Sequence, residues 1–208
     1  IMLSGEPMFS ESQLTRALIA AEDAGIAVTL LLNKIDLPTA ALARERLQPY
    51  RNMGLAVLET ALKAAPAEAR ALLGPVLAGR TTLVLGPSGM GKSTLINLMV
   101  PRAEAQVGEI SQALNAGRHT TTTTTWYWLD DVGPGASGTR AAMLDSPGFQ
   151  EFGLMHITPQ RLAELMPDIR AHLGSCRFYN CTHLHEPGCG VRAAADRGAG
   201  RVLHSAVG

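Results

Sequence analysis

A glycine-rich octapeptide near the middle of the chain has the composition of a phosphate-binding loop. In the pattern GxxxxGK[ST], glycines let backbone N–H groups converge on phosphate oxygens at a helix N-terminus, and the lysine reaches the β- and γ-phosphates. The pattern is matched by Gly86, Pro87, Ser88, Gly89, Met90, Gly91, Lys92 and Ser93. A glycine-rich turn without a ligand would carry the same letters, but an aliphatic run precedes the loop and a helical pattern follows it. We therefore predict nucleotide binding by residues 86–94, Thr94 included, with Ser93 on Mg²⁺ and Lys92 also in catalysis.

A second polar motif, NKxD, lies upstream at the end of an expected strand and consists of Asn33, Lys34 and Asp36. The Asp36 carboxylate can accept hydrogen bonds from N1 and N2 of guanine, whereas adenine would leave it unpaired. The Asn33 amide can bridge to N7 and to neighbouring loops, and the stem of Lys34 can cover the base. Alone, the motif also fits a polar helix cap. Beside a phosphate loop it predicts guanine recognition.

The segment after the next expected strand, residues 59–63, resembles the ExSAK motif of GTPases. In that motif the backbone N–H of Ala61 would meet guanine O6, so Thr60 and Ala61 join the predicted nucleotide site. A plain strand-to-helix turn fits these letters nearly as well.

The segment at residues 145–148 fits the pattern DxxG, in which Asp145 reaches Mg²⁺ through water and the Gly148 N–H senses the γ-phosphate. A type I turn would use similar residues, but the position after a strand and after the phosphate loop favours the sensor. Phe149 stands where many GTPases carry a water-orienting glutamine, so we expect slow hydrolysis by the isolated protein.

Residues 104–125 are polar and weakly periodic, which predicts a mobile loop similar to switch I. One of its threonine hydroxyls can complete the Mg²⁺ shell; we select Thr121, with Thr120 as the alternate. Residues 123–125 are expected to lead into a strand. His119 is predicted to position the attacking water, although loop histidines are more often inert.

Three cysteines and a histidine gather within fourteen positions: Cys176, Cys181, His183 and Cys189. Three thiolates and an imidazole suit a closed, structural Zn²⁺ site. A segment too small to build its own core gains most from such a metal. His185 is a rival ligand, and unrelated free thiols are the remaining alternative.

Alternating strand and helix patterns predict the fold class α/β, with a mostly parallel sheet flanked by helices. Strands are predicted at residues 26–32, 55–58, 82–85, 126–129 and 141–144. Helices are predicted at residues 13–24, 39–50 with Thr39 as the cap, 66–73, 92–99 and 158–172. The last two strands are expected to be joined by a glycine-rich turn. Trp126 and Trp128 are expected to pack within their strand rather than to form a stacking platform for bases.

The 208 residues, 46% of them hydrophobic, are enough for one domain with a small appendage. We predict a GTPase domain over residues 1–151 and a zinc-binding domain over residues 152–208. The net charge of zero gives no electrostatic footprint of nucleic-acid binding. No apolar run approaches the roughly 20 residues that span a bilayer, and the first residues do not form a signal peptide. We expect a cytoplasmic monomer without a membrane partner.

The order of the motifs is circularly permuted, because NKID and ETALK precede the phosphate loop that begins ordinary GTPases. A wider resemblance rests on five segments: LLNKIDL, GPSGMGKSTLIN, GRHTTTTT, LDSPGFQEFGL and CRFYNCTHLHEPGC. Through them, nearly the whole chain from about Gln13 resembles the ribosome-small-subunit-dependent GTPase family (RsgA, also called YjeQ). The resemblance implies a GTP hydrolase of late small (30S) subunit maturation that binds the subunit and its 16S rRNA and is stimulated by it. It places the zinc ligands on Cys176, Cys181, His183 and Cys189, and a catalytic histidine on His119.

The chain departs from the family pattern at several points. The family's N-terminal OB-fold is expected to be absent here, its C-terminal helices to be cut short at Gly208, and its usual serine of the ExSAK motif is Thr60. The permuted order suggests that γ-phosphate contacts at Gly148 reposition the zinc domain. One rival function is a P-loop ATPase or small-molecule kinase, which the relative affinity for GDP and ADP would distinguish. Another is a nucleotide-sensing RNA-binding scaffold with little turnover, with which Phe149 is compatible.

Overall fold

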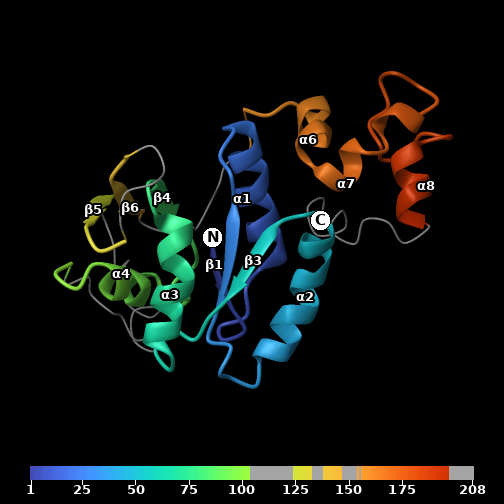
Figure 1. The fold of residues 1–208 in the computed structure, drawn as a ribbon. Helices are drawn as coiled ribbons and strands as arrows, with labels where there is room; N and C mark the ends of the chain where they lie inside the picture. Colours follow the sequence, from blue (N-terminus) through green and yellow to red (C-terminus); the bar gives the residue numbers. More distant parts are fainter. Residues whose placement is uncertain (104–123, 133–137, 147–153, 155, 197–208) are drawn as a thin grey trace, which may run out of the picture. The chain divides into compact units, whose positions relative to one another are not determined.

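The computed structural model describes residues 1–103, 124–132, 138–146, 154 and 156–196 (Figure 1). The chain divides into two compact units that are discontinuous in sequence. The sheet unit comprises Ile1–Phe9, Thr29–Glu45 and Val57–Gln150. The helical unit comprises Ser10–Val28, Arg46–Ala56 and Glu151–Gly208. The predicted domain division between residues 151 and 152 stays a prediction.

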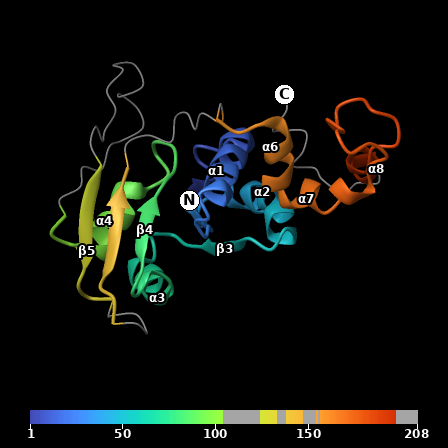
Figure 2. The same ribbon diagram turned by 90° about the horizontal axis from the view of Figure 1, so that it is seen from above.

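The strands of the sheet unit form two three-stranded ladders, with the orders β1-β2-β3 and β4-β6-β5. Pairing is parallel between β1 and β2 and between β4 and β6, while β5 runs antiparallel to β6 (Figure 2). The Met2 N–H donates to the Leu85 carbonyl at 2.7 Å, which joins β1 to the end of β4. The strands are β1 (Met2–Ser4), β2 (Thr29–Asn33), β3 (Ala56–Glu59), β4 (Thr81–Val84), β5 (Thr125–Leu129) and β6 (Ala141–Asp145).

Two helices of the sheet unit, α3 (Pro66–Leu77) and α4 (Lys92–Met99), lie alongside the second ladder (Figures 1 and 2). The apolar face of α4 is buried through Leu95, Ile96 and Met99. On β6, Ala141, Ala142 and Met143 are fully buried. These features confirm the predicted α/β class with a mostly parallel sheet.

The helical unit contains α1 (Glu11–Asp23), α6 (Pro159–Leu165), α7 (Pro167–Arg170), a 3₁₀ turn η1 (Leu173–Ser175) and α8 (Gly190–Asp196). Helix α2 (Ala40–Asn52) begins in the sheet unit and ends in the helical unit. Ser10 caps α1, because its hydroxyl accepts the Gln13 N–H. One apolar core joins α1 to the C-terminal segment and consists of Ile19, Ala163, Leu165, Met166, Ile169, Cys189 and Val191.

Several predicted elements need correction. The helix predicted at residues 158–172 is two helices, because Pro167 has no N–H to donate and disfavours helical geometry at Met166. Helix α3 continues past Pro75 to Leu77, whose side chain is buried. Strand β1 was not predicted.

Thr39 directly precedes α2, at the predicted cap position. Its carbonyl accepts the Ala43 N–H, but its buried hydroxyl has no hydrogen-bond partner among the described residues. The Thr39 side chain instead lies over Gly5, where an added Cβ would come within 2.9 Å of this hydroxyl.

Trp126 and Trp128 pack against each other within their strand, in an edge-to-face contact, but the two side chains are still 47% and 46% exposed. Among the described residues, no helix is long and apolar enough to cross a bilayer.

Candidate functional site

The carboxamide of Asn33, at the end of β2, joins two loops of the sheet unit. Its Nδ2 donates to the Met90 carbonyl at 2.9 Å, and its Oδ1 accepts the Leu62 N–H at 3.1 Å. The side chain is only 4% exposed, so both bonds are shielded from water. A buried amide with both ends paired fixes the spacing of the groups that it connects. The phosphate-loop pattern and the segment after β3 are therefore held at a set distance from the NKxD motif.

Glycine at position 91 is required by this junction. Gly91 has a φ of 103°, and a Cβ at this position would collide with the Asn33 amide nitrogen. On the other side, Met90 is buried, and its sulfur accepts the Ser4 hydroxyl at 3.0 Å. Sequence reasoning missed Ser4, because a three-residue strand carries too little pattern to be predicted.

Lys92 begins α4, whose first turn has no side-chain cap. Its ammonium donates to the carbonyls of Gly86 at 2.5 Å and Pro87 at 3.2 Å. Burial lowers the pKa of Lys92, and the nearby Asp145 carboxylate opposes this shift. The uncapped N–H groups and the ammonium together form a site suited to an anion.

Asp145 ends β6 directly beside Val84 of β4. It is 3% exposed, and its Oδ1 has no hydrogen-bond partner in the described part of the chain. Burial raises the pKa of this carboxyl, and Lys92 opposes the shift. An unpaired buried carboxylate oxygen is costly in a fold and is typical of a position reserved for a ligand or a cation.

The NKxD motif turns sharply after β2, with Lys34 in a left-handed conformation. Lys34 has a φ of 61°, and its ammonium donates to the Glu6 carbonyl at 2.6 Å. Asp36 is exposed. The Thr60 N–H donates to the Leu32 carbonyl, and the Thr60 carbonyl accepts the Ile35 N–H, so the segment after β3 runs beside the motif.

The structure thus gathers most of the predicted nucleotide-site residues in the sheet unit: Asn33, Lys34, Asp36, Thr60, Ala61, Gly86–Thr94 and Asp145. The predictions for His119, Thr120, Thr121, Gly148 and Phe149 lie outside the described residues.

A thiol cluster forms in the helical unit. The ligand atoms of Cys176, Cys181, His183 and Cys189 all lie within 4.8 Å of one another. The Nδ1 atom of His183 is 3.6 Å from the Cys176 sulfur and 3.5 Å from the Cys189 sulfur. Tetrahedral zinc, with Zn–S bonds of about 2.3 Å and Zn–N bonds of about 2.0 Å, places sulfur and nitrogen ligands about 3.5 Å apart. The four side chains therefore fit a zinc ion.

The pKa values of the clustered thiols are also consistent with a bound cation. Burial raises the pKa of Cys176, but N–H groups of Gly190 and Val191 at the start of α8 outweigh it and lower the pKa below its usual value. Burial and the neighbouring thiols raise the pKa of Cys181 to about 11. Thiols this close cannot all ionise unless a positive ion balances them.

Glu186 supports the cluster and was missed by sequence reasoning. Its carboxylate accepts the Thr182 hydroxyl, the Thr182 N–H at 2.9 Å and the His185 N–H at 3.3 Å, and lies 3.8 Å from the Cys181 sulfur. These bonds, with the Thr182 hydroxyl as the largest cause, lower the pKa of Glu186 to about 2. The sequence signal of this support is weak: Glu186 follows Thr182 by four residues and directly precedes Pro187 and Gly188.

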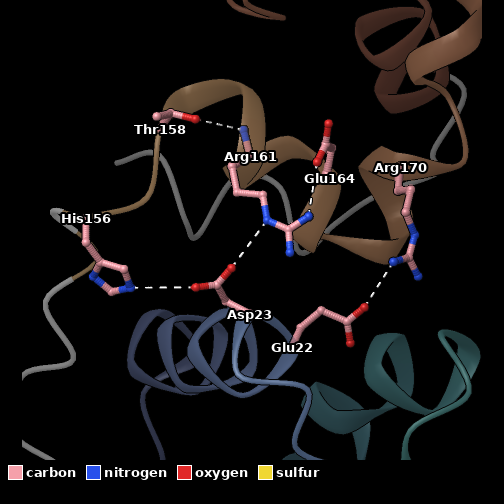
Figure 3. Close-up of polar contacts among 7 residues, drawn as sticks. All are labelled: Glu22, Asp23, His156, Thr158, Arg161, Glu164 and Arg170. Carbon is pink, nitrogen blue, oxygen red and sulfur yellow. Dashed lines mark hydrogen bonds and ion pairs between the residues drawn. The ribbon is translucent and has the colours of Figure 1, made fainter.

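A seam of ion pairs, defined as Glu22, Asp23, His156, Arg161, Glu164 and Arg170, fastens α6 and α7 to α1 within the helical unit (Figure 3). Arg161 lies between Asp23 at 3.3 Å and Glu164 at 3.1 Å, and His156 reaches Asp23 at 3.7 Å. Arg170 pairs with Glu22 at 3.0 Å. Helices α6 and α7, which precede the thiol cluster in the chain, are thereby held to α1, and the paired residues Asp23 and Arg161 are 138 positions apart in sequence.

Comparison with known proteins shows which family this chain is similar to. Residues 1–155 match the family described as RsgA GTPase. A protein of Variovorax paradoxus (strain S110) named small ribosomal subunit biogenesis GTPase RsgA is 58% identical over 197 residues, which are 94% of this chain and 60% of that protein. A protein of the same name from Burkholderia pseudomallei (strain 668) is 57% identical over 195 residues, 93% of this chain and 60% of that protein. This chain therefore spans 60% of the length of these relatives.

Two solved structures share the fold. The crystal structure of YloQ, a circularly permuted GTPase, matches with a TM-score of 0.70 and 27% identity, over 99% of this chain and 63% of that one. YjeQ from Thermotoga maritima matches with a TM-score of 0.74 and 24% identity, over 99% of this chain and 67% of that one, a likeness of fold. The fold is that of a circularly permuted GTPase, as the order of the motifs predicted.

Proposed function

The chain belongs to the RsgA GTPase family, and from this premise we propose that it hydrolyses GTP during late maturation of the small ribosomal subunit. The observation that carries the proposal is the Asn33 junction, which connects the NKxD motif, the phosphate-loop pattern and the segment after β3. The relatives' names supply the small subunit as the partner. In keeping with that partner, we propose stimulation by the subunit, contact with its 16S rRNA and action in the cytoplasm.

We assign the base to the NKxD side. The Asp36 carboxylate accepts the two guanine donors, the Lys34 stem covers the ring, and the free proton of the Asn33 amide can reach N7. Thr60 and Ala61 follow β3 beside the motif, where the Ala61 N–H is proposed to meet O6. Replacing Asp36 with Asn should lower affinity for GDP and raise it for xanthosine diphosphate, because xanthine presents an acceptor at C2. Unchanged GDP affinity, or a preference for ADP, would favour the ATPase alternative.

We assign the phosphates to residues 86–94. Lys92 exchanges its two carbonyl partners for phosphate oxygens, and the uncapped N–H groups of α4 face the same charge. Ser93 and Asp145 would hold Mg²⁺, which neutralises charge on the β- and γ-phosphates. Thr121 is the proposed third contributor, His119 the group that positions water, and Gly148 the γ-phosphate sensor.

We assign Zn²⁺ to Cys176, Cys181, His183 and Cys189. The set leaves no open position for substrate, so the ion would act structurally. His185 donates its backbone N–H to Glu186 and does not belong to the cluster, which supports His183 as the fourth ligand.

The decisive experiment measures GTP turnover with and without purified small ribosomal subunits. Slow turnover alone and strong stimulation by small subunits are expected, with large subunits as the control. Lys92→Ala should abolish the stimulated rate. If turnover stays slow and unstimulated while GTP still binds, the nucleotide-sensing scaffold becomes the better function.

A further inference from the structure

One face of the ladder β4-β6-β5 presents both tryptophans of the chain to solvent. Trp126 and Trp128 are two residues apart on β5, so their side chains leave the same face of the sheet. They are 47% and 46% exposed, and their ring centroids lie 5.4 Å apart at an interplanar angle of 63°. Leu129, on the opposite face, is 1% exposed. Leu129 therefore faces the core, whereas the two indoles on the other face of β5 remain about half exposed.

The strand register extends this aromatic face across the ladder. Trp126 lies opposite Leu144 of β6, and Leu144 lies opposite Leu83 of β4, which is 41% exposed. Directly paired residues point to the same face, so Trp126, Leu144 and Leu83 form one row. Trp128 begins the next row. We call the surface formed by Leu83, Trp126, Trp128 and Arg140 the indole platform.

Arg140 supplies the cation of the platform. Its guanidinium lies 4.7 Å from the centroid of Trp128, in a cation–π contact. It also pairs with Asp130, but the two side chains are 55% and 70% exposed. Exposed ion pairs of this kind contribute little, so a phosphate could displace Asp130 from Arg140 at small cost.

The size and chemistry of the platform select one class of ligand. A stable protein interface takes about 800 Å² from each partner, much more than two indoles and a leucine provide. A single unpaired base needs only one ring face and gains stacking whatever its identity. Exposed aromatic rings on a sheet with an adjacent arginine are one means by which proteins bind single-stranded RNA.

We propose that the indole platform binds unpaired bases of single-stranded RNA, with Trp126 and Trp128 as stacking surfaces and Arg140 as a phosphate contact. The inference rests on the proposed function for its partner, because the small ribosomal subunit offers such RNA. It adds to the sheet unit a surface made of residues other than those assigned to the nucleotide.

Intrinsic fluorescence can test this directly, because the chain has only two tryptophans and both belong to the platform. The full chain is titrated with a short fluorescein-labelled oligouridylate, following anisotropy of the label and, with unlabelled oligomer, quenching of tryptophan emission. Quenching is expected in step with binding. The double variant Trp126→Ala, Trp128→Ala should bind at least about tenfold more weakly, and Trp→Phe at both positions should restore part of the affinity. Arg140→Ala should reduce the dependence of binding on salt.

Tyr179→Ala is the matched control, because Tyr179 is an aromatic residue of the helical unit with a relative exposure of 103%. Its affinity for the oligomer should equal that of the unchanged chain. The proposal would be overturned if Tyr179→Ala lost as much affinity for the oligomer as the double variant. It would also be overturned if the unchanged chain did not bind the oligomer at low salt, or bound it without quenching of tryptophan emission. A dimer in sedimentation velocity that the double variant dissociates would also overturn it, in favour of self-association.

GDP affinity, measured on the same samples, separates the two proposals. All platform variants should bind GDP as the unchanged chain does, which also shows that they fold. If the unchanged chain binds the oligomer through its tryptophans but does not bind GDP, the proposed function fails and the platform stands.

Discussion

The junction around Asn33 is built largely from backbone groups, whereas the thiol cluster of the helical unit is built from side chains. At the junction one amide pairs with a carbonyl and an N–H, and glycine at position 91 makes room for it. In the cluster, three sulfurs and an imidazole crowd within 4.8 Å. A neutral amide network is satisfied without a ligand, while neighbouring thiolates repel each other until a cation is present. From this difference we expect the sheet unit to be preformed and the helical unit to gain stability from a bound cation.

Removal of the metal should have the largest effect and should be confined to the helical unit. Structural zinc supplies about 10–16 kcal/mol of apparent binding free energy in small domains, enough to hold the segment folded. A chelator is therefore expected to abolish hydrogen-exchange protection over residues 156–196, and in α1 through the shared core that contains Ile19 and Cys189. GDP affinity should persist. If the chelator also abolished GDP binding, the sheet unit would not be independent of the metal.

A second prediction tests which histidine, His183 or His185, is the fourth zinc ligand. His183→Ala should release zinc, as measured by a colorimetric metal indicator, and should reproduce the effect of the chelator. His185→Ala is the matched control, because His185 is exposed and outside the cluster. Zinc release from the second variant but not from the first would exchange the two assignments.

Loss of the Asn33 amide should rank next. Asn33→Ala leaves the Met90 carbonyl and the Leu62 N–H without their partner, and each buried group left unpaired costs about 1–3 kcal/mol. Urea unfolding of the sheet unit should shift accordingly, and GDP affinity should fall because the two loops lose their spacing. Asn52→Ala, at the exposed end of α2, is the control and should leave both unchanged.

Gly91→Ala should act through the same contact. The added Cβ meets the Asn33 amide, and a φ of 103° disfavours any side chain, so the variant should be destabilised by about 1–3 kcal/mol. In the double variant with Asn33→Ala the collision is gone while the backbone strain remains. In urea unfolding, the double variant should therefore lose less unfolding free energy than the sum of the losses in the two single variants. Strict additivity would show that Asn33 and Gly91 do not constrain each other.

The sequence predicts those parts of the molecule whose chemistry is local. Gly86–Ser93 and the Cys–His spacing are recognisable because a short loop must supply all its own groups. Residues whose partners lie far away in the sequence were missed, because the residues near Ser4 do not indicate that its hydroxyl contacts Met90. The exposure of the aromatic face of β5 could not be predicted, because alternation shows that a strand has two faces but only the neighbouring elements decide which face is covered.

The ion-pair seam should have the smallest effect and should separate electrostatic from apolar docking within the helical unit. Asp23→Asn removes the carboxylate charge that faces both Arg161 and His156, whereas Glu22→Gln removes one contact, with Arg170. Exposed pairs are screened by salt, so we expect Asp23→Asn to lower the Tm of the zinc-loaded chain by roughly 1–2 °C in dilute buffer and Glu22→Gln by less. Both differences should vanish in 1 M salt, because the apolar core around Ile19 remains. A large drop that persists at high salt would mean that the ion pairs, rather than the core, hold the thiol-bearing segment to α1.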